Sequence, residues 1–161
     1  MRAVLQICRD ASVTIDEKLH ASIGRGMVLL VGVAATDTDA DAALLADKIV
    51  KLRIFEDENG RLNKNICEAE ISGDVLAVSN FTLYADCKKS RRPDFFASAK
   101  GEAAKALFDS FIAHLRFKYT DFCRENGYRT PEIQTGVFGA DMQVALTGDG
   151  PVTLILDTAD L

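Results

Sequence analysis

Residues 27–33 read MVLLVGV, an apolar run that begins directly after Gly26 and ends at a loop rich in threonine and aspartate. A short continuous apolar run bounded by turn residues is typical of a fully buried strand. This stretch therefore predicts a strand in the interior of the fold. The residues on either side of it indicate which elements surround that strand.

Two short runs precede it, RAVLQIC at 2–8 and ASVTID at 11–16, and a polar break separates them. Their β-branched or alternating composition predicts two further strands, so that three strands open the chain. Downstream, Thr38 can cap a helix, and the apolar spacing of Ala42, Leu45, Ile49 and Leu52 places them on one helical face. The sequence therefore predicts a first helix near 39–53.

The second half of the chain contains one long helical pattern between groups of strands. DENGR at 57–61 predicts a turn, and DVLAVSNFTLY at 74–84 predicts a strand that ends in polar and aromatic residues. A continuous apolar stripe predicts a second helix over about 95–125. Three strand-like runs separated by turns containing glycine close the chain: EIQTGVF at 132–138, DMQVALT at 141–147 and VTLILDT at 152–158.

The order of these elements predicts the fold class. Strands that follow one another, with only two main helices, indicate an α/β fold of the α+β kind, in which a mainly antiparallel, barrel-like sheet packs with the helices. A chain of 161 residues with 48% apolar residues is long enough to bury one core. We therefore expect residues 1–161 to form a single domain.

Composition and charge limit the possible classes of function. The net charge of −5 argues against a protein that coats nucleic acid through bulk electrostatics, so any such contact must be local. One basic stretch, CKKSRRP at 87–93, is either a solvated loop or a site for phosphate groups. No membrane span or signal peptide is apparent, and we expect a soluble, cytoplasmic protein with no membrane partner.

The metal-binding and catalytic patterns that can be recognised in a sequence are absent. Four well-separated cysteines without a C-x-x-C spacing predict reduced, buried thiols, and with only two histidines we expect no metal and no cofactor. Ser79 lacks the flanking glycines of a hydrolase elbow, and neither His20 nor His114 is an obvious base for a nucleophile. By themselves, the polar residues that follow Val78 indicate only the exposed end of a strand.

Several stretches taken together nevertheless resemble one family. MRAVLQ at 1–6, DKIVKLRIFEDENGRLN at 47–63, VSNFTLYADCKKSRRPDFFASA at 78–99, TGVFGADMQVAL at 135–146 and DGPVTLILDT at 149–158 occur in this order. In this order and at these spacings they resemble the D-aminoacyl-tRNA deacylase family, also called D-tyrosyl-tRNA deacylases. The resemblance covers essentially the whole chain. It implies a homodimer that hydrolyses the ester of D-aminoacyl-tRNA, and of mischarged glycyl-tRNA, as chiral proofreading in translation.

The resemblance also implies which residues form the site. A Ser-Gln-x-x-Thr motif of the family matches Ser79, Asn80, Phe81 and Thr82, which we expect to be the catalytic segment. A Gly-Pro motif with a cis peptide bond matches Gly150 and Pro151, which we expect to reach into the partner subunit's pocket and reject L-amino acids. The basic loop then becomes a tRNA-binding segment, with the side chains of Lys88, Lys89, Arg91 and Arg92.

Three positions depart from the family pattern: Asn80 replaces a glutamine, Ile7 replaces an arginine and Gly148 replaces an asparagine. The family's arginine would donate hydrogen bonds to the Gly-Pro carbonyl groups, and Ile7 cannot. Arg9 is a candidate to replace this missing donor. These departures leave a second interpretation open, a non-catalytic tRNA- or nucleic-acid-binding relative with a degraded pocket. A third, a plain esterase on small substrates, lacks support because the chain has no nucleophile–base pair.

Overall fold

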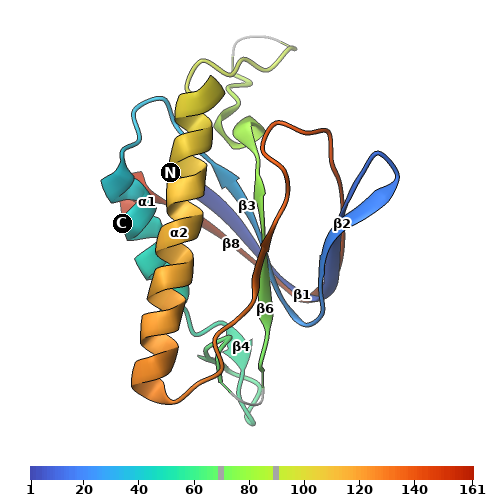
Figure 1. The fold of residues 1–161 in the computed structure, drawn as a ribbon, viewed down its shortest axis with the longest axis vertical. Helices are drawn as coiled ribbons and strands as arrows, with labels where there is room; N and C mark the ends of the chain where they lie inside the picture. The colour runs from blue at the N-terminus through green and yellow to red at the C-terminus, as the bar shows by residue number, and fades with distance from the viewer. Residues whose placement is uncertain (69–70, 89–90) are drawn as a thin grey trace.

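The structure, a computed structural model, describes residues 1–68, 71–88 and 91–161 and shows a curved sheet with two helices on one face (Figure 1). The elements in chain order are β1 (Arg2–Ile15), β2 (Lys18–Ile23), β3 (Gly26–Gly32), α1 (Asp39–Val50), β4 (Phe55–Glu56), β5 (Leu62–Lys64), β6 (Asp74–Ser79), the 3₁₀ helix η1 (Phe81–Tyr84), α2 (Gly101–Asn126), β7 (Ile133–Thr135), β8 (Gln143–Asp157) and the 3₁₀ helix η2 (Thr158–Asp160). Neither α1 nor α2 is long and apolar enough to cross a membrane, and the same holds for the other described helices.

The long strand β1 organises the sheet. Its residues Arg2–Cys8 pair with β3 and its residues Ala11–Ile15 pair with β2, while β8 pairs with β1 over nearly its whole length. These three pairings are antiparallel, and so is the small β4–β5 hairpin. β3 pairs with β6, and β6 with β7, in parallel. The expected barrel-like sheet with two helices is therefore confirmed, but the sheet is mixed.

Strand β3, which contains all of the run MVLLVGV except its last residue, Val33, is buried on both faces, as its composition predicts. Met27, Leu29 and Val31 point into the cluster that packs under the two helices. Val28 belongs to a second cluster on the opposite face, which β1, β2 and β6 complete. Because successive side chains of a strand alternate between faces, a run without polar residues can supply both clusters.

Two pairs of predicted strands are each one continuous strand, which corrects the expected element list. RAVLQIC and ASVTID form β1, and DMQVALT and VTLILDT form β8. The polar pair Arg9–Asp10 and the segment 148–151 indicated breaks, but both lie at register shifts within the β1–β8 pairing. β2 was not predicted, and β6 ends at Ser79, so that Phe81–Tyr84 is a helical turn and not strand.

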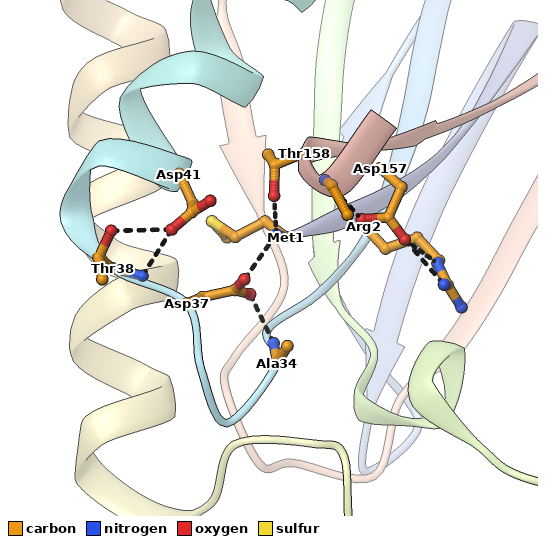
Figure 2. Close-up of polar contacts among 9 residues, drawn as sticks. Met1, Arg2, Ala34, Asp37, Thr38, Asp41, Asp157 and Thr158 are labelled. Carbon is orange, nitrogen blue, oxygen red and sulfur yellow. Dashed lines mark hydrogen bonds and ion pairs between the residues drawn. The ribbon is translucent and has the colours of Figure 1, made fainter. Parts of the chain in front are cut away.

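Both helices form where their apolar spacing predicts them, although their bounds are narrower. α1 ends at Val50 rather than near residue 53, and α2 begins at Gly101 rather than near residue 95. The Asp41 carboxylate accepts hydrogen bonds from the backbone N–H and the hydroxyl of Thr38, both at 2.8 Å, which fixes the start of α1 (Figure 2). Of the four free thiols, three are buried as expected, but Cys87 is exposed.

Polar contacts join the start of β1 to the start of α1 and the end of β8 (Figure 2). The Met1 ammonium group donates to Asp37 Oδ1 at 2.8 Å and to the Thr158 hydroxyl. Asp37 also accepts from the Ala34 N–H at 2.6 Å, so its carboxylate holds the loop that leads into α1. Arg2 forms an ion pair with Asp157 at 2.7 Å. Three segments far apart in the sequence are thereby held together.

At Gly26 the backbones of β3 and β6 lie so close together that there is no room for a side chain. A Cβ atom on Gly26 would lie 1.9 Å from the carbonyl oxygen of Asp74, the residue that it pairs with. The Gly26→Ala variant should therefore lower the free energy of unfolding by about 2 kcal/mol or more, because the backbone of one strand must move. Urea denaturation of both proteins measures this difference.

Gly24→Ala is the matched control, since no atom lies within 4 Å of a Cβ at that position. It should unfold close to the wild-type urea concentration. Equal midpoints for the two alanine variants would show that the β3–β6 contact does not require glycine.

Candidate active site

A pocket of about 210 Å³ lies where the three parallel-running strands β3, β6 and β7 end. Each strand, or the segment that follows it, supplies part of the wall, and the start of α2 closes the pocket. The lining residues are Val31, Val33, Ser79, Asn80, Phe81, Ser98, Ala99, Ala104, Phe138, Gly139, Ala140 and Met142. Ligands of open sheets with parallel strands commonly bind beyond the carboxyl ends of these strands, which is where this pocket lies.

Three of the four residues expected in the catalytic segment line this pocket, namely Ser79, Asn80 and Phe81. Asn80 N–H donates to Val31 O at 2.8 Å, which extends the contact between β6 and β3 past the end of the strand. The chain then turns sharply into η1. This turn exposes Phe81 at the pocket, and Thr82 is exposed outside the lining.

The Asn80 side chain stabilises the turn. Its Oδ1 accepts from the Thr82 N–H at 3.1 Å and from the Thr82 hydroxyl at 2.5 Å. A short amide can make this local bond back to its own backbone, as aspartate and asparagine do in Asx turns. The shorter side chain at this position is therefore accommodated within the turn. Among the described residues, the Phe81 N–H has no acceptor and is available to a ligand.

Arg2 supports the same turn from the other side. Its guanidinium donates to Leu83 O at 2.7 Å and lies 4.8 Å from the centre of the Tyr84 ring. The ion pair with Asp157 holds the guanidinium in place (Figure 2). Burial, together with the carboxylates of Asp37 and Asp157, raises the pKa of Tyr84, so that its hydroxyl stays neutral in this acidic surrounding. Sequence reasoning did not identify Arg2, because its partners are distant in the chain.

The structure places the Gly150–Pro151 segment away from this pocket within one chain. In the β1–β8 pairing, Gln6 faces Thr153 and Cys8 faces Gly148, so Ile7 alone lies opposite residues 149–152. The extra residues bulge out, and Gly150 and Pro151 are exposed. Gly150 has φ +117°, a conformation that glycine adopts most easily, and the Gly150–Pro151 bond is cis.

The surroundings of this bulge show what two of the departures do. Ile7 is buried and lines a small hollow of about 80 Å³ together with Asp149 and Gly150. The Ile7 side chain therefore brings no hydrogen-bond donor to the bulge, whereas Arg25 lines the same hollow. A Cβ on Gly148 would meet no atom within 4 Å, so this position is open space. Arg9 Nε donates to Asp149 Oδ1 at 3.1 Å, which ties the adjacent residue to β1.

The basic loop is closed by a short backbone bridge. The backbone groups of Asp86 and Asp94 exchange hydrogen bonds of 2.9 and 3.0 Å, which brings the two ends of the loop together. Lys88, Arg91 and Arg92 are exposed on it, and Lys89 lies outside the described residues. The loop directly follows the turn that borders the pocket.

The described residues offer no histidine or thiol as a base or nucleophile beside the pocket. His114 Nε2 lies 3.2 Å from Asp39 Oδ1 on the surface between the helices, and His20 is exposed on β2. Burial, with a smaller contribution from Asp10, raises the pKa of Cys8 to about 11, so this thiol is protonated at neutral pH. Over the same residues, no group of three or more metal-ligating side chains occurs.

Comparison with known proteins identifies the class to which this fold and pocket belong. The family model described as D-Tyr-tRNA(Tyr) deacylase matches residues 4–157, so the chain belongs to this family. It is 47% identical over 160 residues to a D-aminoacyl-tRNA deacylase of Thermus aquaticus, covering 99% of this chain and 97% of the relative. A D-aminoacyl-tRNA deacylase of Chlorobaculum parvum is 48% identical over 158 residues, with 98% of both chains covered.

The fold is also similar to solved structures. A protein described as c-Myc DNA Unwinding Element Binding Protein is 37% identical, with a TM-score of 0.82 and 98% of both chains covered. A structure described as that of a "probable eukaryotic D-amino acid tRNA deacylase" has a TM-score of 0.77 at 19% identity, with 96% of this chain and 97% of that chain covered, which shows the shared fold. The family that the sequence resembles is thereby confirmed.

Proposed function

We propose that this protein hydrolyses the ester bond between a D-amino acid and tRNA and acts as a carboxylic ester hydrolase in translation proofreading. The observation that carries the proposal is the pocket at the ends of β3, β6 and β7, bordered by the Ser79–Phe81 segment, in a chain that belongs to this family. Curated relatives with nearly full coverage are named D-aminoacyl-tRNA deacylases, which supports the same activity here. Mischarged glycyl-tRNA is proposed as a further substrate.

The chemistry that we propose depends on positioning. The aminoacyl ester is already reactive, so that a held carbonyl group and an aligned water molecule suffice for hydrolysis. The free Phe81 N–H can donate to the carbonyl oxygen as it gains negative charge in the tetrahedral intermediate. The water oxygen forms a new bond to the carbonyl carbon, and the ester bond to the tRNA ribose then breaks. The proton that the water molecule loses passes to the ribose oxygen that leaves. The neighbouring ribose 2′-hydroxyl is the proposed relay for that proton.

For chiral selection, we propose a homodimer in which Gly150 and Pro151 of one subunit border the other subunit's pocket. Both residues are exposed in the single chain and lie at a bulge away from their own pocket, which fits a role on a partner. Fixed backbone at the pocket would exclude the side chain of an L-amino acid, whereas a D-amino acid can direct its side chain away from it. Glycine, without a side chain, would not be excluded.

The basic loop is proposed to bind the tRNA backbone. Lys88, Arg91 and Arg92 are exposed on the loop that follows the turn at the pocket, and Lys89 belongs to the same stretch of sequence. Phosphate contacts position a nucleic acid without reading its sequence, which suits an enzyme that acts on many tRNAs. Translation takes place in the cytoplasm, and we propose that compartment for this protein.

The proposed activity is tested by supplying the purified protein with D-tyrosyl-, L-tyrosyl- and glycyl-tRNA in parallel. Release of D-tyrosine and glycine, with the L-ester intact, is the expected result, because the three substrates differ only at the α-carbon. The same rates should be measured with a chelator, since no metal-ligating group is found among the described residues. Binding of tRNA without hydrolysis would favour a non-catalytic relative, and equal cleavage of small esters would favour a plain esterase.

Thr82→Ala distinguishes positioning from nucleophilic catalysis. The Thr82 hydroxyl donates to Asn80 Oδ1 and has no base beside it, so we expect it to position the turn. Loss of one hydrogen bond predicts a decrease in kcat/KM of about tenfold or less on D-tyrosyl-tRNA. Removal of a nucleophile would instead lower kcat by several orders of magnitude. A loss of that size in a folded variant that still binds tRNA would identify Thr82 as the nucleophile.

Gly150→Ala tests the proposed chiral wall. A Cβ on Gly150 would lie 2.8 Å from Val152 N, and φ +117° strains any L-residue, so the bulge must change shape. We expect L-tyrosyl-tRNA cleavage to rise at least tenfold relative to D-tyrosyl-tRNA cleavage. Gly148→Ala is the control, because its Cβ meets no atom within 4 Å, and it should retain the wild-type ratio. An unchanged ratio in Gly150→Ala would refute the wall.

Mixed dimers show which subunit supplies the wall. Ala140→Trp should fill the pocket and abolish hydrolysis by its own chain, since Ala140 lines it. Consider a heterodimer of one Ala140→Trp subunit and one Gly150→Ala subunit, in which only the pocket of the Gly150→Ala subunit is active. If the wall crosses the interface, this pocket receives the intact wall of the Ala140→Trp subunit and stays selective. If each chain supplied its own wall, the only active pocket would be the unselective one.

A further inference from the structure

Phe96 is the most exposed of the large apolar side chains in the part of the chain that the structure describes. It is 83% exposed, although it directly follows Phe95, which is half-buried. Single exposed apolar side chains are common on protein surfaces, so the exposure of Phe96 alone does not indicate a binding site. Its surroundings must be considered as well. The relevant features are the position of Phe96 at the pocket and the positive charge beside it.

The segment from Asp94 to Lys100 holds Phe96 at the rim of the pocket. Phe95 packs edge-to-face on Phe81, a pocket residue, with 5.0 Å between the ring centres. Ser98 and Ala99, two and three residues after Phe96, line the pocket, and Ser98 pairs with Ala34. Because its neighbours on both sides are anchored to the pocket, Phe96 is held outside its wall and faces solvent.

One lysine lies beside this ring, and further basic residues occur on the loop that precedes it. The Lys100 ammonium lies 5.8 Å from the centre of the Phe96 ring, within the range of a cation–π contact. Lys88 and Arg91 are exposed on the preceding loop, whose end at Asp94 lies two residues before Phe96. The Asp94 carboxylate accepts from the Phe96 N–H at 3.3 Å and thus serves the local turn. An aromatic face beside a lysine ammonium group, on a segment that follows a basic loop, matches the chemistry of single-stranded nucleic-acid sites.

We propose that Phe96 and Lys100 form a stacking site for an unpaired nucleotide of the tRNA 3′ end, next to the terminal adenosine. This inference rests on the proposed function. An aminoacyl group held in the pocket keeps its ribose at the pocket mouth, so the preceding unpaired nucleotides must leave across the rim. The base stacks on the Phe96 ring, and the Lys100 ammonium contacts the adjoining phosphate. Stacking on an aromatic ring does not require a particular base, and the tRNA contact is therefore independent of sequence.

The test compares Phe96→Ala with Phe117→Ala on D-tyrosyl-tRNA. Phe117 is 70% exposed on α2 and supplies the matched control, because the same apolar area is removed outside the proposed site. Phe96→Ala should raise KM about tenfold with little change in kcat, the size expected for one stacked base. Phe117→Ala should behave like the wild type, and Phe96→Trp should restore the low KM. A wild-type KM for Phe96→Ala would overturn the proposal.

A truncated substrate separates stacking from a defect in the pocket. D-tyrosyl-adenosine carries the ester but not the preceding nucleotides, so the effect of Phe96→Ala should be confined to the intact tRNA. An equal loss on both substrates would show that Phe96 supports the pocket, and would overturn the proposal. A change of oligomeric mass in Phe96→Ala would do the same, because it would identify the ring as a subunit contact.

Binding of uncharged tRNA tests the stacking site independently of the proposed hydrolysis, because no ester is cleaved in this measurement. Fluorescence anisotropy should give a Kd about tenfold higher for Phe96→Ala than for Phe117→Ala. If the wild-type protein cleaved neither substrate, the proposed hydrolysis would fail, and this binding measurement would still decide whether the stacking site exists. Equal Kd values for the two variants would show that it does not.

Discussion

Hydrogen bonding of β1 on both edges is the constraint on which the rest of the structure depends. Its first half pairs with β3 and its second half with β2, while β8 pairs with both halves. The strand also serves two apolar clusters, with Leu5 under the helices and Val13 on the opposite face. Because a shift of one residue would turn each side chain to the wrong face, the burial fixes the register. In this register, residues 149–152 of β8 all lie opposite Ile7, and the extra residues form the Gly150–Pro151 bulge.

The parallel pairings of β3, β6 and β7 determine where the pocket forms. They direct the ends of three strands to one side of the sheet, where the segments after Val31, Ser79 and Thr135 meet. Arg2 connects the two systems, since it lies on β1 and donates to the turn that borders the pocket. The strand that fixes the bulge therefore also supports the turn that follows Ser79. In the proposed dimer, each β1 would organise parts of two sites.

Local patterns in the sequence predicted the elements well where one element buries one regular face. The run at 27–33 and the apolar stripe of α2 are examples, and both are confirmed. The patterns failed where a strand continues through polar residues or glycine, as at Arg9 and Gly148, because long-range pairing with the neighbouring strand maintains the extended backbone there. Parallel pairing was also not predicted, since no local signal encodes it. The family resemblance predicted Ser79, Asn80 and Phe81 as site residues, and all three line the pocket. Phe138 and Met142 also line it, but they could be identified only from the folded chain.

The three departures from the family pattern have different physical consequences, and none disturbs the fold. The Asn80 side-chain oxygen accepts two hydrogen bonds from Thr82 within the turn, and Gly148 lies in open space. Neither residue therefore leaves an unfilled cavity or an unpaired oxygen. Ile7 matters more, because its buried side chain lines the hollow beside the bulge and offers no hydrogen-bond donor to it. The Arg9–Asp149 pair is a polar contact of the bulge, but Arg9 is 72% exposed, and exposed pairs contribute little to stability. The β1–β8 pairing therefore fixes the two ends of the bulge, and the proposed selectivity resides in its backbone geometry.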